Sequence, residues 1–121
     1  MPSQETLDAF VATVEREDYV GAIERFYTAD ASMQENHGAT RKGRDTLVEG
    51  EKGVVARFKA IHATCVRPVL VEGDLVVVRW QFTFENKDGS KRSLDELAYQ
   101  CWQGEKIAEE RFYYDPAQMR G

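Results

Sequence analysis

The sequence contains few residues of the types that mark metal, redox or membrane proteins. Its 121 residues include two cysteines and two histidines, and none of them stands at the spacing of a metal or redox motif. No apolar run approaches the roughly 20 residues that a membrane span needs. The first residues have neither the basic start nor the apolar stretch of a signal peptide. We therefore expect a cytoplasmic protein with reduced cysteines, no metal and no cofactor.

Motifs of nucleotide, nucleic-acid and serine-hydrolase sites are missing as well. There is no phosphate loop, no dinucleotide fingerprint and no Gly-x-Ser-x-Gly. The net charge is −5 and lysine and arginine do not cluster, whereas a nucleic-acid-binding protein usually has a basic face. The composition, 42% hydrophobic and 31% charged, is that of an ordinary globular domain, and the length suffices for one core.

The first half of the chain has the pattern of helices. One helical face is formed by apolar residues at positions i, i+3, i+4 and i+7: Leu7, Phe10, Val11 and Val14. Ser3 stands where its N-cap belongs, and Asp18 is a good cap for a second helix. A third helix is predicted within "KGRDTLVEGEKGVVARF", where Thr46 and Glu49 have capping-box spacing. Its internal glycines fit either a mobile lid or a closely packed helix.

The second half predicts four antiparallel strands, at about 61–72, 75–87, 90–103 and 106–114. The turns between them are placed at Gly73-Asp74, Asp88-Gly89 and Gly104-Glu105. Two-residue turns fix the register and so decide which side chains share a face. The inner, apolar face then contains Val69, Val71, Cys65, Val78, Trp80, Phe82, Phe84, Leu97, Tyr99, Cys101, Ala108, Phe112 and Tyr114. Arg67 and Pro68 hint at a bulge in the first of these strands.

Acidic residues fall on this inner face. In the short strand "TADASMQENHG", Glu35 alternates with Met33 and therefore points into the core, and His37 follows it. The register adds Asp95 beside Phe82 and Glu110 beside Tyr99. A buried, unpaired carboxylate is costly, so three of them near aromatic residues indicate a pocket in which a carboxyl is paired or used.

A carboxyl in an apolar pocket has a raised pKa and can act as a general acid or base. The candidate catalytic residues are the acids of the pocket and its histidine: Glu35, Glu110, Asp95 and His37. The candidate ligand-binding residues are the apolar and aromatic side chains around them: Tyr27, Met33, Trp80, Phe82, Phe84, Tyr99, Phe112 and Tyr114.

A structural role is the alternative for two of these residues. Glu35 can be held by a hydrogen bond from a tyrosine (Tyr27, Tyr99 or Tyr114) or by an ion pair with Arg67. His37 can be a turn residue at the mouth of the pocket.

Three segments in order, "FYTADASMQEN", "KGRDTLVEG…ARF" and "GEKIAEERFYYDP", resemble the SnoaL-like branch of the nuclear transport factor 2-like superfamily. The resemblance implies an α+β fold with a single SnoaL-like domain over 1–121. This is a cone-shaped α+β barrel in which about three N-terminal helices pack on a curved antiparallel sheet. Relatives include ketosteroid isomerase, polyketide cyclases and limonene epoxide hydrolase.

The resemblance also assigns positions. Glu35 falls where ketosteroid isomerase has its catalytic Asp, but Phe10 stands at the position of its oxyanion-hole Tyr. The position of its second acid holds Leu97 or Ala98, so both oxyanion donors are missing, which argues against steroid isomerisation. The catalytic acid of the cyclases falls on Phe112, with Glu110 one inward position earlier.

Three functions remain open. The chain can be a cofactor-free isomerase, cyclase or hydrolase that uses a pocket carboxylate on a small, apolar, oxygenated molecule. It can bind the same kind of molecule without turnover, or it can be a protein-interaction domain. We also expect a homodimer through the outer face of the sheet, because apolar residues are predicted there: Val66, Leu70, Val77, Ala98, Trp102 and Ile107.

Overall fold

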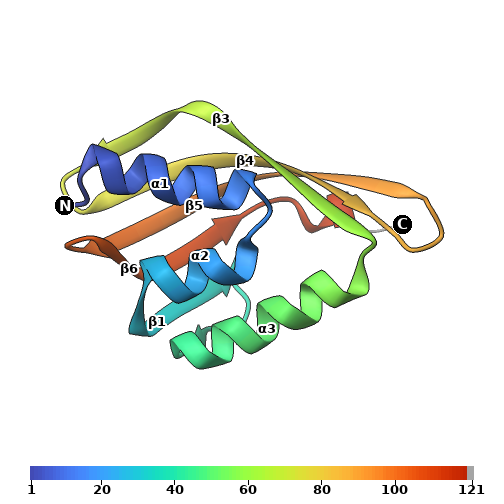
Figure 1. Cartoon of the computed structure of the whole chain (residues 1–121), viewed down its shortest axis with the longest axis horizontal. Helices are drawn as coiled ribbons and strands as arrows, with labels where there is room; N and C mark the ends of the chain where they lie inside the picture. Colours follow the sequence, from blue (N-terminus) through green and yellow to red (C-terminus); the bar gives the residue numbers. More distant parts are fainter. Residues whose placement is uncertain (120–121) are drawn as a thin grey trace.

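The sheet of the protein curves around its helices, as a computed structural model that describes residues 1–119 shows (Figure 1). The helices are α1 (Gln4–Glu15), α2 (Tyr19–Phe26), α3 (Arg44–Arg57) and a short 3-10 helix (Pro116–Met119). The strands are β1 (Tyr27–Glu35), β2 (Arg41–Lys42), β3 (Ala60–Glu72), β4 (Leu75–Glu85), β5 (Lys91–Gln103) and β6 (Lys106–Tyr113). Within the described part, no helix has the length and apolar character to cross a membrane.

The six strands form one mixed sheet in the order β2-β1-β6-β5-β4-β3. The expected helices and the expected antiparallel strands β3 to β6 are present, and the α+β barrel-like fold is confirmed. The expectation of a purely antiparallel sheet is wrong, because β1 pairs with β6 in parallel. This pairing joins two segments far apart in the sequence, which local turn signals cannot reveal.

The first two helices begin where their caps predict. The Ser3 side chain accepts a hydrogen bond from the Thr6 backbone at 3.1 Å, and Asp18 accepts one from the Gly21 backbone at 3.0 Å. The capping box predicted for α3 is wrong. That helix begins after Gly43, whose φ of 99° lies in the region that favours glycine, and no side chain caps it.

The register between β4 and β5 differs from the prediction by one residue. Glu85 pairs with Lys91, so a loop of residues 86–90 replaces the two-residue turn. Because side chains alternate, this shift turns over the whole of β5. The residue opposite Trp80 is therefore Glu96 and not Leu97. The predicted inner residues Leu97 and Tyr99 are 44% and 40% exposed.

A bulge in β6 restores the predicted face beyond it. Trp102 pairs with Ile107, but Cys101 pairs with Glu109, so Ala108 is an extra residue. Glu110 therefore lies opposite Gln100 and points inward, as predicted. The turned-over β5 also moves two of the predicted outer residues, Ala98 and Trp102, into the core, where Ile107 of β6 joins them.

β3 has its own irregularity. It contains a bulge between Val66 and Leu70, the region in which the sequence hinted at one. Cys65 pairs with Trp80 and is buried, as the inner-face prediction requires.

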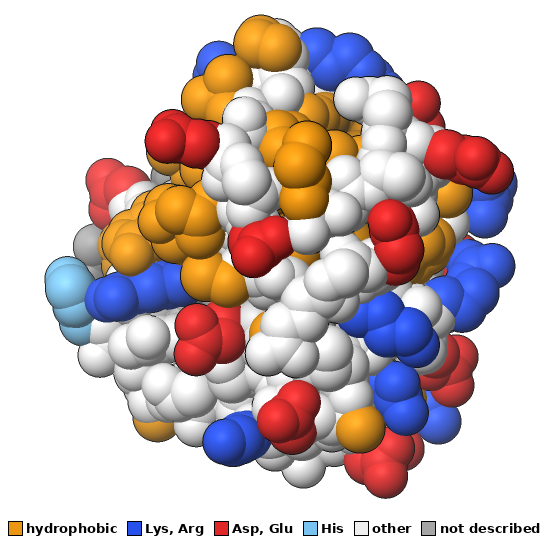
Figure 2. Space-filling view, turned by 90° about the vertical axis from the view of Figure 1, so that its left-hand side faces the viewer, with side chains coloured by type: hydrophobic (Ala, Val, Ile, Leu, Met, Phe, Trp, Pro, Cys, Tyr) orange, Lys and Arg blue, Asp and Glu red, His pale blue; other side chains and the backbone are white. Residues whose placement is uncertain are grey.

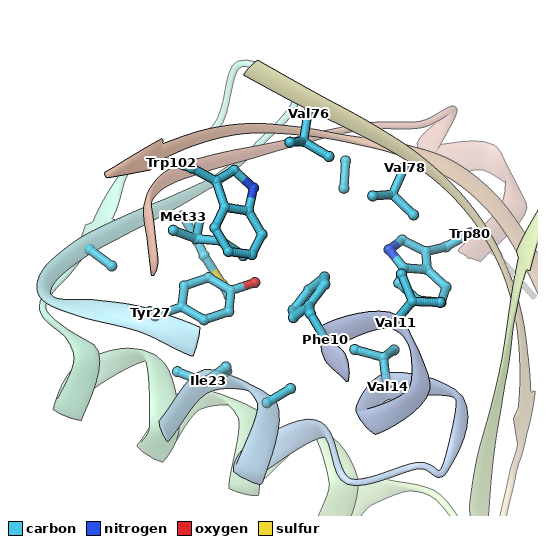
Figure 3. Packing of buried hydrophobic residues seen from close by; sticks show 14 of the residues in the cluster. Phe10, Val11, Val14, Ile23, Tyr27, Met33, Val76, Val78, Trp80 and Trp102 are labelled. Atoms are coloured by element: carbon cyan, nitrogen blue, oxygen red, sulfur yellow. The ribbon is translucent and has the colours of Figure 1, made fainter. Parts of the chain in front are cut away.

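The main core lies between α1, α2 and the inner face of the sheet. Figure 3 shows Phe10 of α1 among Tyr27 of β1, Trp80 of β4 and Trp102 of β5. The ring of Phe10 meets that of Trp102 edge-on, with centroids 5.9 Å apart. α1 and α2 lie in the hollow of the sheet, and α3 lies alongside α2 and β1 (Figure 1). This arrangement leaves a cavity between the helices and the sheet.

Candidate functional site

The cavity has a volume of about 190 Å³, and its walls are mainly apolar. Seven of the lining residues are aromatic: Phe10, Tyr19, Tyr27, Trp80, Phe82, Phe84 and Phe112. Five charged residues from five different elements also line it: Glu35, Arg41, Glu51, Glu96 and Glu110. Four carboxyl groups and one guanidinium group therefore share a small apolar space.

Glu110 is fully paired. Its side chain is 4% exposed, the Tyr27 hydroxyl donates to Oε1, and Gln100 Nε2 donates to Oε2 at 2.6 Å. Trp102 Nε1 donates to Gln100 Oε1 at 3.0 Å. Because an indole N–H only donates, this contact turns the amide NH₂ of Gln100 toward Glu110. Burial raises the pKa of Glu110 to about 7, although both hydrogen bonds act to lower it.

Glu96 is buried without a partner. β5 places it opposite Trp80 on the inner face, where it is 8% exposed. Within residues 1–119 its carboxyl makes no hydrogen bond or ion pair. Burial, followed by the negative charges of Glu110, Glu35 and Glu51, raises its pKa to about 8. Glu96 therefore keeps its proton at neutral pH and can donate it to a molecule in the cavity.

Glu35 lies at the mouth of the cavity and not in its depth. Its side chain is 52% exposed, Arg41 Nη2 lies 3.7 Å from its Oε2, and the Tyr114 hydroxyl donates to its Oε1 at 3.1 Å. The expected burial of Glu35 is wrong, but it does line the cavity. The tyrosine of the structural alternative is Tyr114, and the cation is Arg41, since Arg67 pairs with Glu15.

The other acid of the cavity, Glu51, comes from α3. Burial raises its pKa, the positive charge of Arg41 lowers it, and the negative charge of Glu35 raises it. The buried residues of α3, Leu47 and Val48, lie in the first half of the helix. Glu51 and Val54, in the second and less buried half of the helix, line the cavity.

The structure brings eight of the predicted site residues to the cavity: Glu35, Glu110, Tyr27, Met33, Trp80, Phe82, Phe84 and Phe112. Two others lie on the outer face of the sheet because of the register shift, so their predicted place in the pocket is wrong. Asp95 binds Arg79 there, with contacts of 3.0 and 2.7 Å, and Tyr99 is exposed.

The last two predicted residues lie beside the cavity. His37 is exposed, and its Nδ1 accepts a hydrogen bond from Arg111 Nη2 at 2.7 Å, away from the lining residues. Tyr114 reaches the site through its hydrogen bond to Glu35.

The charged and amide residues of the site that were not predicted are Glu96, Arg41, Glu51 and Gln100. Glu96 and Gln100 were assigned to the outer face, and the polar loop "NKDGS" was the available signal for the longer turn that moves them inward. The Asn86 backbone donates to the Ser90 carbonyl at 2.8 Å across that loop. For Arg41 and Glu51 the sequence contains no comparable signal. Among residues 1–119, no three acidic, histidine or cysteine side chains gather as a metal site requires.

Comparison with known proteins identifies this architecture. The model of the SnoaL-like domain matches residues 7–110. A protein of Mesorhizobium loti classed as a SnoaL-like polyketide cyclase is 23% identical, with a TM-score of 0.78 over 94% of this chain and 100% of the other. No curated protein matches the sequence.

Two further solved structures have the same fold. A Catenulispora acidiphila protein with a ketosteroid isomerase-like fold, in complex with trimethylamine, is 20% identical, with a TM-score of 0.78 over 93% of this chain and 87% of the other. An LEH-like epoxide hydrolase of M. tuberculosis is 13% identical, with a TM-score of 0.77 over 95% of this chain and 84% of the other.

Proposed function

The chain belongs to the family of SnoaL-like domains, and we propose that it is a cofactor-free enzyme that transfers a proton on a small, mostly apolar, oxygenated molecule. The observation that carries this proposal is Glu96, a carboxyl group 8% exposed on a cavity wall without a partner among the described residues. Its carboxyl is largely removed from bulk water and makes no hydrogen bond or ion pair within residues 1–119, which costs stability. An interaction between the Glu96 carboxyl and a bound molecule would explain why a glutamate stands at this position.

The neutral carboxyl of Glu96 is the proton donor in this proposal. At neutral pH it donates a hydrogen bond to a carbonyl oxygen of the ligand. Glu35, at the mouth of the same cavity, takes a proton from the carbon next to that carbonyl. The electrons of the C–H bond form a C=C bond, those of the carbonyl double bond move to the oxygen, and the oxygen takes the proton of Glu96, so that an enol forms. In a ligand with a C=C bond next to the deprotonated carbon, this enol is a dienol. Glu35 then returns its proton to the far carbon of the dienol while the O–H proton goes back to Glu96, which gives the conjugated isomer.

Glu110 supports this division of roles. Its negative charge is the second cause, after burial, of the raised pKa of Glu96. Tyr27 and Gln100 hold Glu110 in place and act to lower its own pKa, so of the two acids Glu110 loses its proton first. Two acids whose surroundings separate their pKa values are a common basis for acid–base catalysis.

The relatives support the class of substrate. A polyketide cyclase and an epoxide hydrolase are named for reactions on oxygenated organic molecules. The oxyanion donors of ketosteroid isomerase are missing from this sequence, and in this proposal the neutral carboxyl of Glu96 takes their role. We do not propose a steroid as the substrate. A cavity of about 190 Å³ holds a single ring of six or seven atoms more readily than four fused rings.

Hydrogen–deuterium exchange of cyclohexanone tests the proposal. The wild-type protein should speed the appearance of deuterium next to the carbonyl in D₂O, as proton NMR reports, and Glu96→Gln should slow this reaction about 100-fold. Glu109→Gln, on the exposed side of β6, is the control and should leave it unchanged. The proposal fails if wild-type exchange equals that of buffer, or if Glu96→Gln exchanges as fast as the wild type.

Binding without turnover is the second candidate, and the contacts of Glu35 favour it. Arg41 and Tyr114 each contact one oxygen of this carboxylate, so both of its oxygens already have partners in the fold. Cyclohexanone that shifts the NMR signals of cavity residues without gaining deuterium would establish this function in place of catalysis.

We also propose that the protein forms a homodimer through the outer face of its sheet. Leu97 and Tyr113 are paired neighbours on β5 and β6, and they are 44% and 42% exposed. Tyr99 extends this apolar patch beside the Arg79–Asp95 ion pair. At the end of the molecule shown in Figure 2, hydrophobic side chains also reach the surface among acidic and basic ones.

Analytical ultracentrifugation tests the dimer. The wild type should sediment as a dimer, and Leu97→Lys should shift it toward the monomer, because a charge would then lie in the apolar patch. A wild-type monomer at high concentration would rule this interface out.

A further inference from the structure

The charges around the cavity do not balance. Glu35 of β1, Glu51 of α3, Glu96 of β5 and Glu110 of β6 line the cavity, and Arg41 of β2 is the cation among the described lining residues. Like charges within this group contribute to the raised pKa values of Glu51 and Glu96. The protein therefore holds more carboxyl groups in one apolar space than it neutralises itself.

We infer that the natural ligand carries a basic nitrogen as well as an oxygen, and that it binds in this cavity as an ammonium ion. The inference rests on the proposed function, whose proton donor it leaves in place. Three features of the cavity support it: the excess of carboxyl groups, the buried Glu96 that has no partner within residues 1–119, and the aromatic side chains of the wall.

The aromatic wall suits a cation. The faces of aromatic rings carry partial negative charge and attract ammonium groups within about 6 Å of the ring centre. The rings of Trp80, Phe82 and Phe84 follow one another along β4, with neighbouring centroids 6.0 Å apart. A carboxylate ligand would instead face like charges in a poorly solvated space, and a neutral ligand would leave the repulsion between the carboxyl groups unchanged.

The two polar groups of the ligand have separate partners. Glu96, whose pKa lies above that of Glu110, keeps its proton for the oxygen. The ammonium group neutralises the other acids of the cavity, chiefly Glu110, which ionises before Glu96, and Glu51 of α3. The other titratable and charged groups that line the cavity with Glu110 are Tyr19, Tyr27, Glu35, Arg41, Glu51 and Glu96.

Proton release should accompany binding. A bound cation stabilises the ionised form of Glu110 and so lowers its pKa, which lies at about 7 in the free protein. Below this pH, binding must displace the proton of Glu110, whereas well above it the proton has already left. The affinity for a cation therefore rises as the pH rises through about 7, and the affinity for a neutral molecule does not.

Three probes with one benzyl ring separate these cases. A cavity of about 150 Å³ in another protein accepts benzene, so a benzyl group fits one of about 190 Å³. Benzylamine, benzyl alcohol and benzoate are titrated into the wild-type protein by calorimetry at about pH 6 and about pH 8. Benzylamine should bind about tenfold more tightly than benzyl alcohol at the higher pH, and benzoate most weakly. Buffers of different ionisation enthalpy should report protons released with benzylamine near neutral pH.

Glu51→Gln and Glu109→Gln form a matched pair, since each removes one negative charge. Glu51 lines the cavity and Glu109 lies on the exposed side of β6. Glu51→Gln should weaken benzylamine about threefold or more and leave benzyl alcohol unchanged, whereas Glu109→Gln should change neither. The inference is overturned if benzylamine does not bind, if benzyl alcohol or benzoate binds as tightly, or if the two variants behave alike.

The two proposals fail separately. If cyclohexanone exchanges deuterium in a way that depends on Glu96, but benzylamine is not preferred, the proposed function stands and the proposal of an ammonium ligand fails. A preference for benzylamine without any exchange would keep the ammonium site in a binding protein.

Discussion

Two glutamates on neighbouring strands line the same cavity in opposite ways. Glu110 of β6 meets Tyr27 and Gln100, and Trp102 orients that glutamine, so each polar atom of this chain of contacts has a partner. Glu96 of β5 is nearly as buried and has no partner among residues 1–119. Burial raises the pKa of both acids, to about 7 and about 8.

The difference separates a carboxyl that the fold uses from one that it leaves available. Removing a paired group exposes the unmet hydrogen-bonding needs of its partners, which is costly in the interior. Removing an unpaired acid relieves the fold, so its presence calls for a role outside folding. Substitutions in the contacts of Glu110 and at Glu96 should therefore change stability in opposite directions.

The largest loss of stability is expected from a substitution of Gln100, which lies between Glu110 and Trp102 in this chain of contacts. Gln100→Leu removes the donor to Glu110 and the acceptor for Trp102 in a fully buried place, and should lower the free energy of unfolding by about 3 kcal/mol. Urea titration measures the loss, with Gln103→Leu on the exposed part of β5 as the control. A loss below about 1 kcal/mol would mean that the chain of contacts is not formed.

Changing Glu110 itself should destabilise the fold less. In Glu110→Gln the new amide oxygen still accepts from Tyr27, but its NH₂ meets the NH₂ of Gln100. The expected loss is about 2 kcal/mol at about pH 8, measured by the same titration. Equal or higher stability would show that burial of the charge outweighs the hydrogen bonds.

Glu96→Gln should instead stabilise the protein. The pKa of Glu96 is raised in the fold, so the wild type loses stability relative to the variant as the pH rises from about 4.3, the unfolded value, to about 8. The gain should be close to zero at about pH 4 and roughly 1–3 kcal/mol at about pH 8. Thermal melts across this range measure it, and a variant that is less stable at high pH would show that Glu96 has a partner in the fold.

Asp95, next to Glu96 in the sequence, should give the smallest effect. It lies on the outer face in an exposed pair with Arg79, and such pairs contribute little to stability. Asp95→Asn should therefore unfold within error of the wild type in the same melts. These melts are made at a concentration at which the protein is a monomer, and a clear loss there would mean that the Arg79–Asp95 pair contributes more than an exposed ion pair does.

The contrast between Glu96 and Asp95 also shows how far the sequence led. Helix periodicity placed Leu7, Phe10 and Val11 correctly, because local spacing decides which side of a helix is apolar. A strand register depends on the length of one loop, and the loop before β5 is longer than its Asp88-Gly89 signal indicates. Because of that difference, Glu96 lines the cavity where the sequence predicted Asp95.

Glu110 was placed on the inner face for a reason that did not hold. The shift of β5 and the bulge at Ala108 cancel each other, so β6 returns to the predicted face. Such compensation lies in the pairing of distant strands, which neither composition nor alternation reveals. The segments that carried the family resemblance were enough to predict the fold, but not which acid faces the ligand.

The most direct test of the account is the pH titration of Glu96 itself. Carbon-13 NMR of labelled glutamate side chains follows each carboxyl group, and Glu96→Gln identifies the signal that disappears. We expect the Glu96 carboxyl to titrate near pH 8, above that of Glu110. Titration near the ordinary value of about 4.3 would show that Glu96 is ionised at neutral pH and would contradict its role as the proton donor.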